Sequence, residues 1–383
     1  MPVNIQSYIN QLTFDRNDLQ FTIGCGIAAA FTLFYLFNYF VPVKKTAVGK
    51  LSSKAPGISI VITSCNNRSI LEKNLPLWLS QDYPNFEVIV ADDRSTDETL
   101  FFLIEQQQLH PKLQIVSLDP HFVKMGGKKL ALTLAIKKSQ FQFFLITEVD
   151  VVPASNQWLK LMSLQLGNKK NEIVLGASPI CSGRGFLATL VQHELLLNSL
   201  QFLGLAKMGK PYMGMGKNLA YSRSIYDSVN GFSKHHHLPM GDDVLFVQEA
   251  ATATNTAICI HPDAYTLGDG PASWKLYWRQ NAQKLWIEKS FDSKVKKRII
   301  VYPLLQLSFW IGIIIWFIIG HQWAWPLIAL LVKIVPEWIV FYQKGKLLQM
   351  NKSIILYPFF NLFESFWFPL TRINSFFSKK IIW

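Results

Sequence analysis

The sequence contains few residues of the kinds that build zinc sites or disulfide frameworks. Its 383 residues include only four cysteines, Cys25, Cys65, Cys181 and Cys259, which are widely scattered and form no CxxC pair. We therefore expect reduced, mostly buried thiols. The three consecutive histidines at 235–237 are a poor metal site, because neighbouring loop residues rarely converge on one ion. We expect a flexible polar loop there.

Acidic residues are scarce relative to basic ones. There are 25 Asp and Glu against 38 Lys and Arg, which gives a net charge of +13. So basic a chain first suggests nucleic-acid binding, but no helix-turn-helix, zinc-finger or aromatic RNA-platform pattern occurs. Many basic residues instead flank apolar segments: Lys44, Lys45, Lys50, Lys54, Lys294, Lys296, Lys297 and Arg298. Such flanks orient membrane helices and favour anionic lipids, so we expect a membrane partner and no nucleic acid.

The N-terminus lacks the features of a signal peptide. Residues 1–18 are polar and have no basic start, so we expect the hydrophobic run after them to stay in the protein. That run, at 21–41, has about the ~20 residues needed to cross a bilayer. It predicts a transmembrane helix over 19–42, ended by Pro42. The lysines after it predict that the chain from residue 42 onward lies in the cytoplasm.

A second apolar region near the C-terminus predicts two more spans. The runs 301–319 and 323–342 are separated by three residues, which is typical of a transmembrane hairpin over 301–342. Lys333 and Glu337 share one face of the second helix, where they are expected to neutralise each other or, alternatively, to bind a lipid head group. We expect a multi-pass protein of the inner (plasma) membrane.

The last apolar stretch, 353–371, is interrupted by proline, asparagine and glutamate and has lysines on both sides. This pattern favours an interfacial or re-entrant segment over a further span.

Between the apolar regions, residues 57–290 alternate short β-branched runs with helical stretches. Strands are expected at 58–64, 86–93, 113–119 and 141–150, with helices over 69–80, from about 95 onward and over 126–138. This order predicts an α/β domain with a mainly parallel sheet of nucleotide-binding type.

Acidic pairs follow these strands at their C-terminal ends. Asp92 and Asp93 end the second strand, Glu148 and Asp150 end the fourth, and Asp242 with Asp243 come later. Ligands of open parallel sheets bind outside those ends. A nucleoside diphosphate needs a divalent cation, which carboxylates bind, and a nucleophilic hydroxyl needs a carboxylate base. Three acidic clusters fit both needs.

The segment NLPLWLSQDYPNFEVIVADDRSTDET resembles the glycosyltransferase family 2 pattern "L-x-S-L-x-x-Q-x-Y-P-x-x-E-I-I-V-V-D-D-G-S-T-D". With SIVITSCNN before it, the resemblance covers roughly 57–290 and implies a GT-A nucleotide-sugar-binding domain. It implies that Asp92 or Asp93 contacts the nucleotide, with Asn66 nearby. Arg94 stands where the family usually has glycine.

Two further motifs of this family have counterparts here. MGGKKLALTLAI is similar to its "G-K-x-x-A-L-N-x-A" helix start, which places Lys128 near the donor phosphates. ITEVD takes the position of its D-x-D motif. The resemblance implies that Asp150 and Glu148 bind Mg²⁺ or Mn²⁺.

The acceptor side of the family has weaker counterparts. KNLAYSRSIYDSVNGF and the following GDD resemble the segment that supplies the catalytic base, which makes Asp243 the expected base and Asp242 the alternative. In YWRQNAQKLWIEKS, Gln280 and Trp286 correspond to parts of the "Q-x-x-R-W" signature of processive synthases. The Arg-Trp pair itself is absent, which counts against processive synthesis.

These observations predict a membrane-bound inverting glycosyltransferase of cell-envelope glycan synthesis. It would move a sugar from a nucleotide-diphosphate donor, UDP-linked by preference, to a lipid or glycan acceptor. Alternatives within this enzyme class are a polyisoprenyl-phosphate glycosyltransferase and a processive polysaccharide synthase. The alternative of another class is an inactive nucleotide-sugar-binding membrane anchor.

Overall fold

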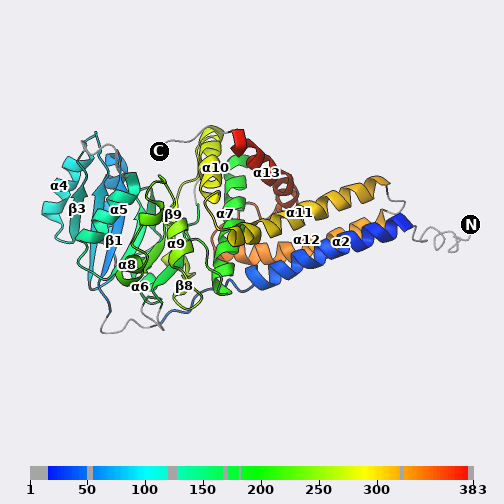
Figure 1. Cartoon of the computed structure of the whole chain (residues 1–383), viewed down its shortest axis with the longest axis horizontal. Coiled ribbons are helices and arrows are strands. Elements are labelled where there is room, and N and C mark those ends of the chain that lie inside the picture. Colours follow the sequence, from blue (N-terminus) through cyan, green and yellow to red (C-terminus); the bar gives the residue numbers. More distant parts are fainter. Residues whose placement is uncertain are drawn as a thin grey trace, which may run out of the picture.

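The computed structural model describes residues 16–49, 55–119, 127–166, 171–180, 183–319 and 323–377. It has a sheet-containing unit at one end and a helical bundle at the other, with the helices α7, α10 and α13 between them (Figure 1). Most of the predicted polar segment 1–18 lies outside the described residues, as does Cys181. Cys25 and Cys259 are buried free thiols, as expected, whereas the free thiol of Cys65 is exposed.

The main sheet has seven strands in the order β3-β2-β1-β4-β7-β6-β8. Its first half consists of β1 (Ile58–Ser64), β2 (Phe86–Asp92), β3 (Leu113–Ser117) and β4 (Phe143–Glu148), all parallel. These four strands lie within the ranges predicted from the sequence. The second half contains β6 (Ile173–Gly176), β7 (Leu219–Ser222) and β8 (Thr256–Cys259), of which β7 runs antiparallel to its neighbours. The mainly parallel α/β fold is thus confirmed.

Helices connect the strands and cover both faces of the sheet (Figure 1). They are α3 (Arg68–Leu79), α4 (Thr99–Leu109), α5 (Gly127–Lys138), α6 (Trp158–Ser163), α8 (Arg223–Ser228) and α9 (Val244–Ala250). A two-stranded sheet of β5 (Val151–Pro153) and β9 (Thr266–Gly268) follows the end of β4. The predicted helices over 69–80 and 126–138 correspond to α3 and α5.

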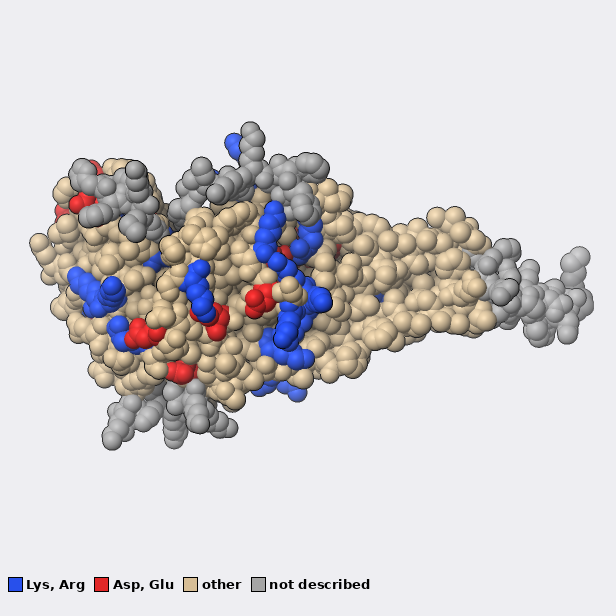
Figure 2. All heavy atoms as spheres, viewed as in Figure 1, with Lys and Arg blue, Asp and Glu red and all other residues tan. Residues whose placement is uncertain are grey.

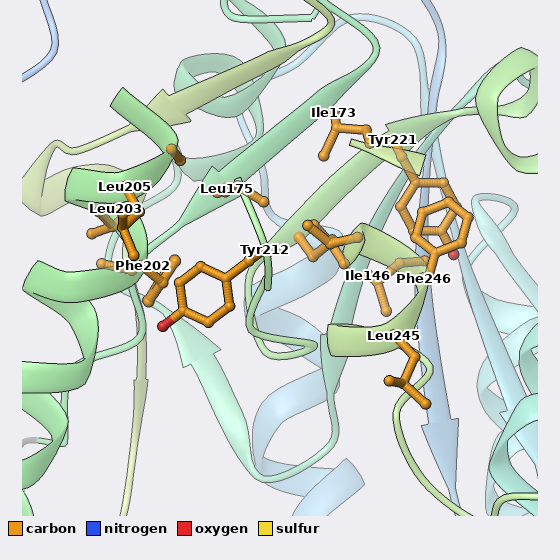
Figure 3. Packing of buried hydrophobic residues seen from close by; sticks show 14 of the residues in the cluster. Ile146, Ile173, Leu175, Phe202, Leu203, Leu205, Tyr212, Tyr221, Leu245 and Phe246 are labelled. Atoms are coloured by element: carbon orange, nitrogen blue, oxygen red, sulfur yellow. The ribbon is translucent and has the colours of Figure 1, made fainter. Parts of the chain in front are cut away.

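The core has one hydrophobic cluster on each face of the sheet, because side chains alternate along a strand. Ile60 and Ile62 of β1 pack on one face, and Val61 packs on the other. Figure 3 shows part of the second cluster, where the rings of Tyr221 and Phe246 have centroids 4.5 Å apart. This packing fixes α9, and therefore the acidic pair at its start, against β7.

Three helices are long and apolar enough to cross a membrane: Leu19–Phe40, Ser293–Ile319 and Ala324–Leu347. The first comprises α2 (Arg16–Tyr35) and a π-helical turn (Leu36–Phe40), and the others are α11 (Ser293–Ile319) and α12 (Ala324–Leu347). They form the bundle that projects from the sheet unit (Figure 1). Basic side chains gather where the bundle meets that unit, and the visible face of the bundle beyond is nearly uncharged (Figure 2). This distribution suits a membrane interface at the base of the bundle.

A buried polar network lies inside the bundle. Lys333 and Glu337 pair as predicted, with Nζ 2.9 Å from Oε2, and both side chains are fully buried. Gln306 of α11 bonds to both of them, and Asn361 accepts from Lys333. The network satisfies both charges by mutual neutralisation, and α12 continues as one helix through Pro336.

A layer of helices separates the bundle from the sheet. It consists of α7 (Gly185–Lys207), α10 (Trp274–Glu288) and α13 (Tyr357–Phe377), which run across the bundle direction in Figure 1. The segment predicted to be interfacial, 353–371, contributes most of α13, which packs against α10 and α11. Its placement relative to a bilayer stays a prediction. Helix α7 has no counterpart among the elements expected from the sequence.

Candidate active site

The loops after β1 and β2 are tied together at the C-terminal edge of the sheet. Asn66 has a positive φ of 55°, and its Oδ1 accepts hydrogen bonds from the backbone amides of Thr96 (2.7 Å) and Asp97 (3.3 Å). Its own amide donates to the hydroxyl of Ser95. The structure therefore brings Asn66 to the second strand's acidic loop, as the sequence implied.

Asp92 and Asp93 have different surroundings at this edge. Asp92 is buried and accepts from the hydroxyl of Ser95. Burial raises the pKa of Asp92, and the bonds from Ser95 offset part of this effect. Asp93 Oδ1 pairs with Nη2 of Arg94 at 2.6 Å. The backbone of Arg94 is left-handed, with φ 58°, a conformation that glycine adopts without strain.

Lys128 joins the acidic groups after β4 to those before α9. Its buried Nζ lies 2.8 Å from Glu148 Oε1 and 3.0 Å from Asp242 Oδ2. Burial alone would lower the pKa of Lys128, but the two carboxylates outweigh it and raise the pKa well above its usual value. Residues more than 90 positions apart in the chain thus form one ion-paired cluster.

Lys217 is a member of this cluster that sequence reasoning missed. Its Nζ lies 2.8 Å from Asp150 Oδ2 and 3.7 Å from Glu148 Oε2, between the two predicted metal ligands. Burial would raise the pKa of Glu148, but Lys128 and Lys217 reverse the effect and lower it to about 2. Lys217 is the first residue of the KNLAYS segment, whose resemblance to the family pointed only to the acceptor side of the site.

The pair Glu148 and Asp150 has the right donor chemistry for Mg²⁺ or Mn²⁺. Mg²⁺ is commonly held by one or two carboxylates together with substrate phosphates. The described residues contain no group of three or more side chains that would hold a metal by themselves. A two-carboxylate site completed by the donor diphosphate therefore fits, provided that Lys217 moves from between the carboxylates.

Asp243 occupies the N-cap of α9. Its Oδ1 accepts from the amide of Val244 at 2.7 Å, and its Oδ2 accepts from the amide of Gly216 at 2.8 Å. Burial and the neighbouring charge of Asp242 raise the pKa of Asp243 to about 6, although Lys128 and the two amides act in the opposite direction. A carboxylate poised near neutral pH is suited to accept a proton.

Asp243 also lines a cavity of about 440 Å³, whereas Asp242 does not. Gln280 of α10 lines the same cavity. Trp286 is not among the lining residues and instead packs against the hydrophobic core. The structure therefore brings Gln280 and Asp243 to one cavity and leaves Trp286 apart from it.

The histidine segment after α8 is anchored to the site. Lys129 donates to the carbonyl oxygens of His235 (2.6 Å) and Leu238 (3.1 Å), and the side chain of His235 is buried. Burial lowers the pKa of Lys129 to about 8. This anchoring places the chain leading to Asp242 beside the start of α5.

The site-bearing region resembles known proteins. Residues 59–229 match the model of Glycosyl transferase family 2. "Probable glycosyltransferase YdaM" of Bacillus subtilis is 22% identical over 66% of this chain and 62% of its own length. "Beta-monoglucosyldiacylglycerol synthase" of Nostoc is 26% identical over 30% of this chain and 25% of its own length. The chain thus spans less than two thirds of either relative.

Among solved structures, a mannosyltransferase from Pyrobaculum calidifontis in complex with GDP-Man and Mn²⁺ has a TM-score of 0.57. It is 17% identical, and the match covers 91% of this chain and 98% of that one. At this identity the likeness establishes a common GT-A fold.

Proposed function

We propose that the chain, whose residues 59–229 match the model of Glycosyl transferase family 2, is a glycosyltransferase that transfers a sugar with inversion from a nucleotide-diphosphate donor to a lipid or glycan acceptor. UDP is the preferred donor nucleotide of this proposal. The Bacillus relative is named a probable glycosyltransferase, and the Nostoc relative is named a synthase of a glucosylated diacylglycerol, which supports a role in cell-envelope glycan synthesis.

The proposed reaction is a single displacement. The acceptor hydroxyl oxygen forms a bond to the anomeric carbon while the bond from that carbon to the diphosphate oxygen breaks. The hydroxyl proton passes to Asp243, and the nucleoside diphosphate leaves with the bonding electron pair. One displacement inverts the anomeric configuration.

The observation that carries this proposal is the position of Asp243, which faces the cavity next to the lysine–carboxylate cluster. Its raised pKa suits a general base. Asp242 is held by Lys128 and is the weaker candidate. Lys128 would keep Glu148 and Asp242 in place and set positive charge close to the donor phosphates.

The donor side is proposed from the loops at the sheet edge. Asp92, Asp93 and Asn66 would bind the nucleoside. By resemblance to the family, Gln280 and Trp286 are also proposed to contact substrate. Glu148 and Asp150 would hold Mg²⁺ or Mn²⁺, which when bound stabilises negative charge on the departing diphosphate.

We also place the protein in the inner membrane as a multi-pass protein with the catalytic unit in the cytoplasm. The three apolar helices and the basic band at the base of the bundle support this arrangement. Accessibility labelling of single cysteines at Lys45 and Trp323 in intact cells tests it. Labelling of position 323 alone from outside is expected, and labelling of position 45 from outside would contradict it.

The activity test is nucleotide release from a panel of UDP- and GDP-sugars. Purified full-length protein in detergent, with Mn²⁺ or Mg²⁺ and membrane lipids, is compared with Asp150→Ala and Asp243→Asn. Metal-dependent release from one donor, lost in both variants, is the expected result. Release that persists in Asp243→Asn would contradict the assignment of the base.

A further inference from the structure

The cavity that contains Asp243 reaches a membrane-spanning helix. Asp243 lines it on the side of the sheet, and Ile299, Tyr302 and Pro303 of α11 line it on the side of the bundle. Its volume of about 440 Å³ falls within the range of small-molecule sites. A smaller adjoining cavity, of about 20 Å³, shares Tyr302 and Pro303 and extends along α11 to Gln306. The larger cavity thus reaches from the proposed base to the bundle.

Much of the cavity wall is apolar and adaptable. Its apolar members include Met213, Met215, Phe291, Ile299, Trp367 and Phe368. Methionine side chains are flexible and adapt to irregular alkyl groups. A wall of this kind, next to a membrane span, suits the glycerol region and upper alkyl chain of a lipid better than it suits a soluble glycan.

The polar groups of the wall suit hydroxyl groups. Glu194 of α7 is positioned by Tyr277, whose hydroxyl donates to Glu194 Oε1 at 2.6 Å and accepts from Trp367 Nε1 at 2.8 Å. Asn281 and Tyr302 also line the cavity, and the amide and hydroxyl of their side chains can bond to oxygen atoms of a ligand.

The charge of the cavity disfavours an anionic head group. Its wall has four carboxylates, Asp243, Glu194, Glu288 and Glu364, against two cations, Lys284 and Arg372. Arg372 is engaged by Glu288, with Nη2 2.7 Å from Oε2. Burial is the main cause that raises the pKa of Glu194 to about 7, and the charge of Glu364 adds to it. A phosphate would meet like charges at short range, whereas sugar or glycerol hydroxyls can donate to the carboxylates.

We infer that this cavity binds the acceptor, and that the acceptor is a membrane lipid with an uncharged, hydroxylated head group. The inference rests on the proposed function and adds the substrate class. One head-group hydroxyl lies at Asp243 and attacks the anomeric carbon. Its proton passes to Asp243, and the nucleoside diphosphate departs. Glu194 and Asn281 bind the remaining hydroxyls, and the alkyl chains follow α11 into the bilayer.

The first experiment compares acceptors in nanodiscs that contain the full-length protein. The probes are dioleoylglycerol and its monoglucosyl derivative, decaprenyl phosphate as the anionic lipid, and maltotriose as the soluble glycan. The readout is transfer of labelled sugar from the donor found in the nucleotide-release panel. Transfer to a neutral lipid at least tenfold faster than to the other probes is expected. Preferential transfer to decaprenyl phosphate or maltotriose would overturn the inference while leaving the glycosyltransferase proposal intact.

Cavity variants separate acceptor binding from the rest of the reaction. Met213→Trp fills the cavity, and Met208→Trp makes the same change at an exposed position just after α7. We expect Met213→Trp to raise the acceptor KM at least tenfold with unchanged donor binding, and Met208→Trp to stay within twofold. Glu194→Gln is expected to raise the acceptor KM as well. Its matched control is Glu105→Gln, at an exposed position of α4. Equal KM values across all four variants would contradict the cavity as the acceptor site.

A binding readout that does not depend on turnover completes the test. A diacylglycerol bearing a diazirine on its head group is photo-crosslinked to wild-type protein in the same nanodiscs, and the labelled peptides are identified. Labelling of α10 and the 212–215 loop, suppressed in Met213→Trp, is expected. Labelling confined to the lipid-facing sides of the bundle would overturn the inference, even if no donor were turned over.

Discussion

Lys217 lies between the two carboxylates that are proposed to bind the metal, with its Nζ 2.8 Å from Asp150 and 3.7 Å from Glu148. It thereby neutralises charge at the position where a divalent cation would contact both side chains. A metal and the ammonium group cannot occupy this position together, so metal binding must displace Lys217. Donor phosphates are suitable new partners for the displaced ammonium group.

Lys217→Met should therefore strengthen metal binding in the absence of donor. Removal of the competing cation is expected to tighten Mn²⁺ binding by about tenfold, because like charges at this range repel strongly in a half-buried site. Isothermal titration with Mn²⁺ measures the effect, and Lys112→Met on the exposed surface is the control. An unchanged dissociation constant would mean that the metal binds away from Asp150.

The pH dependence of transfer should report Asp243. Its carboxyl has a pKa of about 6 and must be deprotonated to act as a base, so kcat/KM should fall tenfold per pH unit below about 6 and level off above it. Asp243→Asn should lose this acidic limb together with most activity. The profile is measured with saturating Mn²⁺ and corrected for reversible loss of donor binding.

Asp242→Asn distinguishes the two candidate bases. The negative charge of Asp242 helps to raise the pKa of Asp243, so its removal should move the acidic limb to lower pH while activity at pH 7.5 is largely kept. If Asp242 were the base, the same variant would be inactive at every pH. Because the charge of Asp242 acts on the pKa of Asp243, the limb is assigned from the variants rather than from wild type alone.

Lys128→Met should destabilise the catalytic unit. Lys128 lies between Glu148 and the buried Asp242, and the full cost of breaking a buried ion pair is reduced here by the partial exposure of Glu148, to about 2–3 kcal/mol. We expect a clearly lower thermal unfolding midpoint in detergent. The triple variant with Glu148→Gln and Asp242→Asn should recover much of the loss, since no buried charge is then left unpaired. Failure of this recovery would indicate that Lys128 stabilises the fold by other contacts.

Position 94 offers a test of backbone strain. At φ 58° a glycine is favoured over alanine by about 1 kcal/mol, the reverse of the usual order. Arg94→Gly should consequently unfold at a higher temperature than Arg94→Ala, both variants lacking the contact with Asp93. Equal midpoints, or a more stable alanine variant, would show that the loop relaxes out of the left-handed conformation.

The sequence alone determined the first half of the sheet and the apolar helices. β1, β2 and β4 are runs of mostly buried residues that can be predicted from local pattern, β3 is a shorter and less buried run, and the spans satisfy a length requirement set by the bilayer. The pairing of Lys333 with Glu337 was predictable too, because residues four apart share a helix face. Helix α7, with 23 residues between the sheet unit and the bundle, was not predicted from the sequence.

The tertiary structure alone decided which charges meet. Lys217 reaches Asp150 across 67 residues of chain, and Lys128 reaches Asp242 across more than a hundred, so neither contact follows from local periodicity. The cavity is likewise assembled from α7, α10, α11, α13, the 212–215 loop and the loop before α9. Residue types and strand ends are properties of local sequence. Ion pairing, burial and the resulting pKa of Asp243 depend on distances that only the packed chain sets.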